Sequence, residues 1–270
     1  MRQWRLIYDY PAIGAWNMAV DEAILSAVGQ GDQPPTLRLY AWDPFCLSLG
    51  YGQQASDVDL TLLREHGWDI VRRPTGGRAI LHGDELTYSV ALPMTHEFAQ
   101  GDVVSSYRLL SQSLMYALGE LGIVPQSEKQ SKSNLRDNGP ICFEVPSHYE
   151  ITILGRKLIG SAQVRRKLGL LQHGTLPLMG DVGRIALALA FPNESARMDA
   201  VDSVRNRAIT LHQALGEVVS WEEAASAVAE GFRQEFDLDL MPAQLSDAEK
   251  AHAEQLLVDI YANDHWTFKR

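Results

Sequence analysis

The feature that most limits the fold is a run of closely spaced strand-like segments in the middle of the chain. Residues 149–154, 157–166 and 170–178 each have the pattern of a β-strand, and only the pairs Gly155–Arg156 and Leu168–Gly169 separate them as turns. Further strand-like segments occur at residues 3–9, 37–41, 46–53, 68–73 and 85–92. The first two-thirds of the chain therefore predicts a sheet built largely from neighbouring strands.

Helical periodicity surrounds these strands. Apolar side chains recur at helical spacing over residues 15–28 and 102–121, and residues 57–66 and 181–190 predict shorter helices, whereas the polar residues 126–140 predict a surface loop. In the last third, Ser220 and Ser246 are each followed three residues later by a glutamate, which is the capping-box pattern of a helix start. We predict an α+β fold, a mixed β-sheet with flanking helices, with a catalytic domain at residues 1–209 and a helical C-terminal part at residues 210–270 packed on it.

Charge and cysteine content exclude several classes of function. The chain has 270 residues with a net charge of −10, which argues against nucleic acid as its main partner. No apolar run reaches the about 18 residues of a membrane span, and no signal peptide is predicted at the start. The two cysteines form no zinc-type pair or disulfide framework. These observations predict a cytoplasmic protein with reduced thiols and no metal.

The segment RRPTGGRAILHGDELTYS, residues 72–89, is the first candidate for a binding loop. Gly76 and Gly77 would let backbone N–H groups approach a ligand closely, and Arg73, Arg78 and His82 surround them. Such a loop suits an anion or a polar headgroup, although it is neither a Walker loop nor a dinucleotide fingerprint. An ordinary hairpin turn explains the paired glycines equally well.

A second candidate region spans residues 141–178 and contains Cys142 and Lys157. An ammonium group beside a thiol favours the reactive thiolate and can stabilise the oxyanion formed when a carbonyl is attacked. Small residues on the same segment, Gly160 to Ala162, would leave room for a ligand chain. Two plainer interpretations remain open, since Cys142 could be a buried apolar thiol and Lys157 a solvated lysine at a hairpin edge.

Three motifs in this order, RRPTGGRAILH, GRKLIGSAQ and LQHGTL, resemble those of the superfamily of lipoate–protein ligase A, octanoyltransferases and biotin ligases. The stretch CFEVPSHYE before GRK, and the ending YANDHWTFKR, are similar to the LipM-type octanoyltransferase branch. The resemblance implies that Cys142 is the acyl-thioester nucleophile and that Lys157 lowers its pKa. It assigns the substrate pocket to Arg73, Gly76, Gly77, Arg78, His82, Ser161, Ala162, Gln163, His173 and Gly174.

The resemblance also implies an activity and its partners. An octanoyl group would pass from octanoyl-acyl carrier protein to Cys142 and then to a lysine of the glycine cleavage H protein or of a lipoyl domain, with no ATP, metal or other cofactor. Three alternatives remain: an ATP-dependent lipoate ligase, an amidotransferase between lipoyl domains, and a non-enzymatic acyl-binding module. The basic cluster Arg165, Arg166 and Lys167 is a candidate contact for the acidic carrier protein.

Overall fold

The computed structural model describes residues 2–124, 126–128 and 150–270, and Cys142 lies outside these residues. Its largest element is an eight-stranded mixed sheet. In spatial order the strands are β11 (Leu238–Pro242), β1 (Arg2–Tyr8), β2 (Thr36–Tyr40), β6 (Glu85–Pro93), β10 (Gly169–Pro177), β9 (Arg156–Arg165), β8 (Glu150–Ile153) and β7 (Gln126–Glu128). Strand β1 runs parallel to both β11 and β2, while the other pairs are antiparallel. The predicted mixed sheet is therefore confirmed.

A smaller three-stranded sheet stands beside the large one. It has the order β4 (Asp69–Arg72), β3 (Cys46–Leu49) and β5 (Ile80–His82). Its apolar side chains pack in one cluster with helix α2 (Leu60–Glu65), the 3₁₀ segment η5 (Val182–Ala188) and helix α4 (Glu194–Arg207). Cys46 is completely buried in β3, where burial raises the pKa of its thiol well above the ordinary value.

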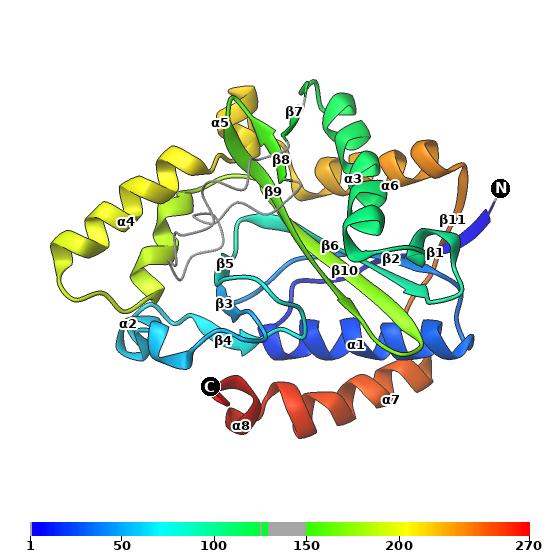
Figure 1. Ribbon diagram of the computed structural model, residues 1–270, viewed down its shortest axis with the longest axis horizontal. Helices are drawn as coiled ribbons and strands as arrows, with labels where there is room; N and C mark the ends of the chain where they lie inside the picture. The colour runs from blue at the N-terminus through cyan, green and yellow to red at the C-terminus, as the bar shows by residue number, and fades with distance from the viewer. Residues whose placement is uncertain (1, 125, 129–149) are drawn as a thin grey trace.

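Helices cover both faces of the large sheet (Figure 1). Helices α1 (Gly14–Gln30) and α7 (Asp247–Leu256) pack on one face around Ile7 and Tyr40, whereas α3 (Val103–Glu120) and α6 (Trp221–Phe236) pack on the other around Trp4 and Leu37. The alternation of β2 explains this division, because Leu37 and Leu39 point to one side and Arg38 and Tyr40 to the other. Within the described residues, every helix is too short or too polar to cross a membrane.

Short segments complete the chain. They are η1 (Ala55–Asp57), η2 (Glu97–Ala99), α5 (Leu211–Leu215), the π-helical η6 (Leu257–Tyr261) and α8 (Asp264–Thr267). The last of these is tied to the small sheet by the buried Arg72, whose Nε donates to the carbonyl oxygen of Thr267 at 2.9 Å. In return, the Trp266 indole N–H donates to the carbonyl oxygen of Arg72 at 2.8 Å. The end of the chain thus supports the strand that leads into the predicted binding loop.

Most predicted elements are present, with instructive exceptions. Both capping boxes form, at Ser220 with Glu223 and at Ser246 with Glu249. The loop prediction for residues 126–140 is wrong at Gln126–Glu128, which pairs with β8 as strand β7, and residues 129–140 lie outside the described part. Strand β11 was not predicted, because a five-residue segment between two helices carries little periodicity. The division into residues 1–209 and 210–270 remains a prediction.

Candidate active site

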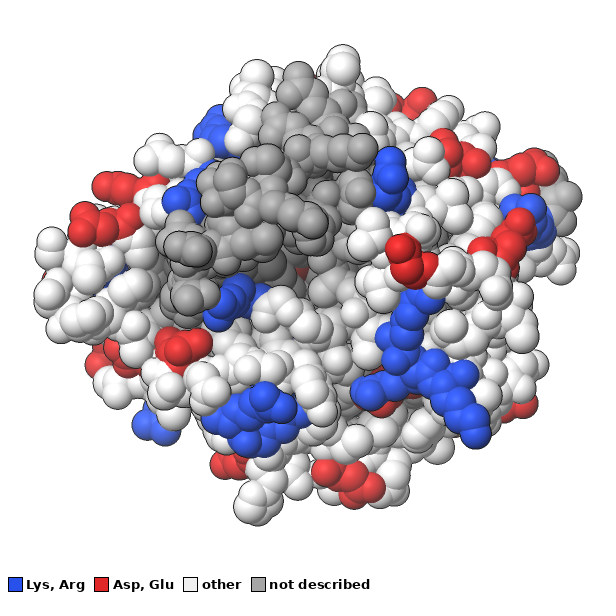
Figure 2. Space-filling view, in the orientation of Figure 1, with Lys and Arg blue, Asp and Glu red and all other residues white. Residues whose placement is uncertain are grey.

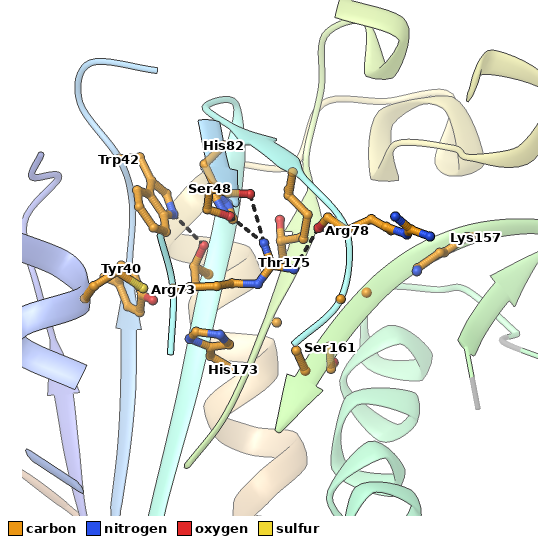
Figure 3. Close-up of a pocket in the computed structure, with 17 residues that line it drawn as sticks. Tyr40, Trp42, Ser48, Arg73, Arg78, His82, Lys157, Ser161, His173 and Thr175 are labelled. Carbon is orange, nitrogen blue, oxygen red and sulfur yellow. Dashed lines mark hydrogen bonds between the residues drawn. The ribbon is translucent and has the colours of Figure 1, made fainter. Parts of the chain in front are cut away.

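A cavity of about 310 Å³ lies where the two sheets meet. Ten of the residues singled out from the sequence line it: Arg73, Gly77, Arg78, His82, Lys157, Gly160, Ser161, Ala162, His173 and Gly174. They come from the binding loop, from β5 and from the β9–β10 hairpin, so the fold brings the three motifs together (Figure 3). Lys157 and Arg78 lie at one end of the drawn cavity, and Tyr40 and Trp42 lie at the other.

The remaining predicted residues lie next to the cavity or outside the described chain. Gly76 does not line the cavity, but its carbonyl oxygen accepts a hydrogen bond from Arg73 Nη2 at 2.9 Å. Gln163 also lies off the cavity wall, where its amide donates to Gln172 Oε1 at 3.0 Å. The role predicted for Cys142 falls on a residue that the structure does not describe.

Arg73 holds the shape of the glycine loop. Its Nη2 donates to the carbonyl oxygen of Arg78 at 2.7 Å, and its Nη1 donates to the carbonyl oxygen of Ser48 at 2.9 Å. Gly77 has a φ of +96°, a region that favours glycine, and a Cβ there would come 2.8 Å from Arg73 Nη2. The buried guanidinium therefore supports the loop from inside, through backbone carbonyl groups and the Ser48 hydroxyl.

His82 belongs to a chain of hydrogen bonds along one wall of the cavity. Its Nδ1 lies 2.7 Å from Glu85 Oε1, its Nε2 lies 2.8 Å from Ser48 Oγ, and its ring stacks on Trp42 at 4.0 Å. Burial alone would raise the pKa of Glu85, but the neighbouring His82 and hydrogen bonds hold it below its usual value. Thr87 also donates to this carboxylate, at 2.5 Å. An ionised Glu85 thus fixes the orientation of the imidazole.

His173 belongs to a second buried network, centred on Asp21. Its Nδ1 lies 3.2 Å from Asp21 Oδ2 and its Nε2 lies 2.7 Å from Thr75 Oγ1. Burial lowers the pKa of His173 in spite of the nearby carboxylate, so the imidazole is neutral at neutral pH. Burial would raise the pKa of Asp21, but the hydrogen bond from His173 and the charge of Arg38, 2.9 Å away, hold it low. Tyr40 donates to the same carboxylate at 3.0 Å.

Small residues on β9 and β10 line the part of the cavity next to His173. Gly174 pairs with Ser161, and a Cβ at Gly174 would come 2.5 Å from Ser161 Oγ and 2.7 Å from the carbonyl oxygen of Gly160. Lys157 is only 4% exposed, and a Cβ at Gly160 would come 3.0 Å from its Cε. The glycines therefore make room both for the contents of the cavity and for the lysine side chain.

Sequence reasoning missed several residues of the cavity wall. These are Met18, Tyr40, Trp42, Ser48, Ile80, Thr87 and Thr175. Ile80, Thr87 and Thr175 lie within the quoted segments but were not selected from them. Met18, Tyr40, Trp42 and Ser48 lie elsewhere in the chain and have no motif of their own, so no local pattern could have grouped them with the cavity. Asp21 was missed for the same reason, because its position within helix α1 reads as an ordinary polar site. Among the described residues, no three His, Cys, Asp or Glu side chains gather in a way that would hold a metal ion.

Comparison with known proteins agrees with this geometry. The model of the lipoyl protein ligase A/B catalytic domain matches residues 14–233. Octanoyltransferase LipM of Brevibacillus brevis is 38% identical, with all of both chains covered, and that of Bacillus subtilis is 35% identical, covering 99% of this chain and 98% of its own. The chain belongs to the LipM octanoyltransferase family. This LipM family member is thereby an acyltransferase with an α+β fold.

Solved structures give the same architecture for the LipM family member. A bipartite lipoate protein ligase from Thermoplasma acidophilum, described with its E2 lipoyl domain, superimposes with a TM-score of 0.82 at 25% identity, covering 99% of this chain and 97% of that chain. An ATP-bound lipoate-protein ligase A superimposes with a TM-score of 0.81 at 24% identity, covering 99% of both chains. The second likeness concerns the fold alone.

Proposed function

We propose that this enzyme transfers an octanoyl group from octanoyl-acyl carrier protein to a specific lysine of a lipoyl-accepting protein. The acceptor is the glycine cleavage H protein or a lipoyl domain, and the group travels as a thioester on Cys142. Membership of the LipM family supports octanoyl transfer in protein lipoylation. The observation that carries the proposal furthest is the buried Lys157 in the wall of a cavity lined by the three family motifs.

The cavity suits an acyl chain that enters beside Lys157. Both histidines in its wall already have partners, so the chain meets ring faces, methyl groups and glycines. An apolar chain loses no hydrogen bond with water on entering such a space, and burying each CH₂ contributes about 0.8 kcal/mol. The lysine end of the cavity is the end at which a charged group and a reacting carbonyl can meet (Figure 3).

In the first step, the Cys142 thiolate attacks the carbonyl carbon of the octanoyl thioester. The ammonium of Lys157 stabilises the thiolate before attack and the oxyanion during it. The carbon–sulfur bond to the carrier then breaks, the carrier sulfur leaves as a thiolate that takes a proton from solvent, and the octanoyl group stays on Cys142. One thioester replaces another, so this step is close to neutral in free energy.

In the second step, the acceptor lysine attacks the enzyme thioester as a neutral amine. The new carbon–nitrogen bond forms, the bond to Cys142 Sγ breaks so that Cys142 leaves as the starting thiolate, and the proton released from the amine goes to solvent. An amide replaces a thioester, which makes this step downhill. Neither step needs ATP or a metal ion.

The test is the intact mass of the protein after mixing with octanoyl-acyl carrier protein in the absence of ATP. We expect one octanoyl adduct that hydroxylamine removes and that Cys142→Ala does not form. Cys46→Ala is the matched control, since this thiol is buried and its pKa is raised by burial. Absence of an adduct in the wild type would contradict the thioester route.

An ATP-dependent ligase is distinguished by the same variants. Such an enzyme would join free octanoate or lipoate to the acceptor only with ATP, and Cys142→Ser would retain that activity. A transferase loses its turnover in the variant Cys142→Ser, and its rate does not change when ATP is added. Supplying octanoylated H protein as the donor, in place of the carrier protein, identifies an amidotransferase.

A further inference from the structure

Cationic side chains gather on the face of the molecule that carries the turn of the β9–β10 hairpin (Figure 2). Arg166 and Lys167 are exposed in this turn. From the other end of the chain, the ammonium of Lys269 stacks on the rings of Tyr51 and Trp266, at 3.6 and 3.5 Å. The whole chain carries a net charge of −10, so this positive surface is a local exception.

The charges of Arg166 and Lys269 lie close enough to act on each other. The pKa of Lys269 lies below its ordinary value because of burial, and because the charges of Arg72, Arg270 and Arg166 repel its proton. Glu22 lies 3.7 Å from Arg166 and offsets part of this charge. No carboxylate of the described chain lies within ion-pair distance of Lys167 or Lys269. An anionic partner would reduce the remaining repulsion between Lys269 and the neighbouring arginines.

The surface is rigidly connected to the acyl cavity. Strand β9 supplies Lys157, Ser161 and Ala162 to the cavity and continues to the hairpin turn. At about 3.3 Å per residue, Arg166 lies roughly 13 Å along the strand from Ala162. Arg165 anchors the turn, because its Nη1 donates to the carbonyl oxygen of Gly101 at 2.7 Å. A partner held at the turn can therefore present a flexible arm to the cavity.

We propose that Arg166, Lys167 and Lys269 form the docking surface for the acidic acyl carrier protein that donates the octanoyl group. This inference rests on the proposed function and adds the place where the donor binds. The net negative charge of the rest of the chain repels an acidic protein, so a positive surface near the cavity directs its approach. The carrier's flexible prosthetic arm then has to reach from the turn to the Lys157 end of the cavity, which lies nine residues or roughly 30 Å along β9 from Arg166.

Charge reversal tests the proposal, with two donors compared. The variants Arg166→Glu and Lys167→Glu are mixed with octanoyl-acyl carrier protein or with the octanoyl thioester of N-acetylcysteamine, which is small and uncharged. The readout is the rate at which the octanoyl adduct forms in a single turnover. Arg64→Glu is the matched control, because this exposed residue on α2 undergoes the same change of charge.

We expect each variant to slow acylation by the carrier protein about three- to tenfold at low salt and to leave the small thioester unaffected. The difference should shrink at about 1 M salt, where the Debye length is about 3 Å. Equal slowing with both donors, or no slowing with either, would overturn the proposal. Slowing confined to transfer from enzyme to acceptor would assign the surface to the acceptor instead.

Direct binding separates this inference from the proposed function. The affinity of the unacylated carrier protein for the wild type and the three variants is measured without turnover. Weaker binding of Arg166→Glu and Lys167→Glu, with Arg64→Glu unchanged, supports the docking surface even if no octanoyl adduct forms. Unchanged binding in all three variants overturns the docking surface, whatever the chemistry of Cys142.

Discussion

Two parts of the cavity wall differ in composition. The wall around His82 and His173 contains many polar groups, and each imidazole nitrogen has a partner within the protein. The stretch of β9 and β10 beside His173 has no side chain at Gly160 and Gly174. The comparison teaches that a cavity for an apolar chain needs satisfied polar groups rather than an absence of polar groups.

The largest effect is expected where the polar wall depends on a buried charge. Asp21→Asn removes the carboxylate that pairs with Arg38 and accepts from Tyr40 and Ser89. Arg38 keeps a second ion pair with Asp9 at 2.9 Å, but the variant loses the charge of Asp21 and weakens its buried hydrogen bonds, so we expect a loss of about 3 kcal/mol in the free energy of unfolding, measured with urea. Asp32→Asn, an exposed change of the same chemistry, should stay within about 0.5 kcal/mol. A loss below about 1 kcal/mol for Asp21→Asn would show that the polar wall does not depend on this charge.

The wall around Gly160 and Gly174, here called the small-residue wall, should be destabilised by added side-chain volume. Gly174→Ala places a methyl group 2.5 Å from Ser161 Oγ and 2.7 Å from backbone, and we expect about 1–3 kcal/mol of destabilisation. The control is Gly52→Ala, because a Cβ at Gly52 meets no atom within 4 Å. Equal unfolding midpoints for the two variants would mean that the wall adjusts freely to added volume.

The sequence predicts the site residues that lie within motifs better than those that lie on separate parts of the chain. Gly76, Gly77 and Arg78 stand next to each other in a motif, as do Ser161 and Ala162, so the family resemblance locates them directly. Trp42 lies just after β2, Ser48 on β3 and Thr87 on β6. They meet only through the pairing of β2 with β6 and of β3 with β5, which one sequence does not specify. Local sequence patterns do not predict which strands distant in the sequence will pair, for the same reason.

The fold itself follows the same rule. The helices with capping boxes, at Ser220 and Ser246, and the hairpin strands β9 and β10 were predicted correctly, because their signals lie within a few residues. Strand β7 was taken for a loop, since its residues are polar and only pairing with β8 makes them a strand. Local chemistry thus predicts elements better than it predicts their partners.

A smaller effect, on kcat/KM, is expected when a larger side chain on β9 projects into the cavity. Ala162→Val adds two methyl groups where Ala162 lines the cavity. We expect kcat/KM for the octanoyl donor to fall about tenfold, and less for a hexanoyl donor, with the unfolding midpoint little changed. Val164→Ile, which adds volume to β9 at a residue that does not line the cavity, is the control. Equal losses for both donors would contradict a steric role.

The smallest effect is expected on the pH dependence of stability, through His173. The pKa of His173 is lowered in the folded protein, so the unfolded chain takes up a proton first as the pH falls below the ordinary value of 6.5. Stability should therefore decrease as the pH falls through this range, and His173→Gln should flatten the dependence of Tm on pH there. His66→Gln, outside the cavity wall, serves as control. If the dependence of Tm on pH persists in His173→Gln, other titrating groups cause it.

The pairing of β1 with β11 has a consequence for the order in which the protein is made. The first strand of the chain pairs with residues 238–242, which leave the ribosome about 10–45 s later at ordinary rates of synthesis. During this interval β1 can pair with β2 on one side only and presents an open strand edge on the other. A growing chain of this enzyme therefore passes through a long period in which another strand could occupy the place reserved for β11.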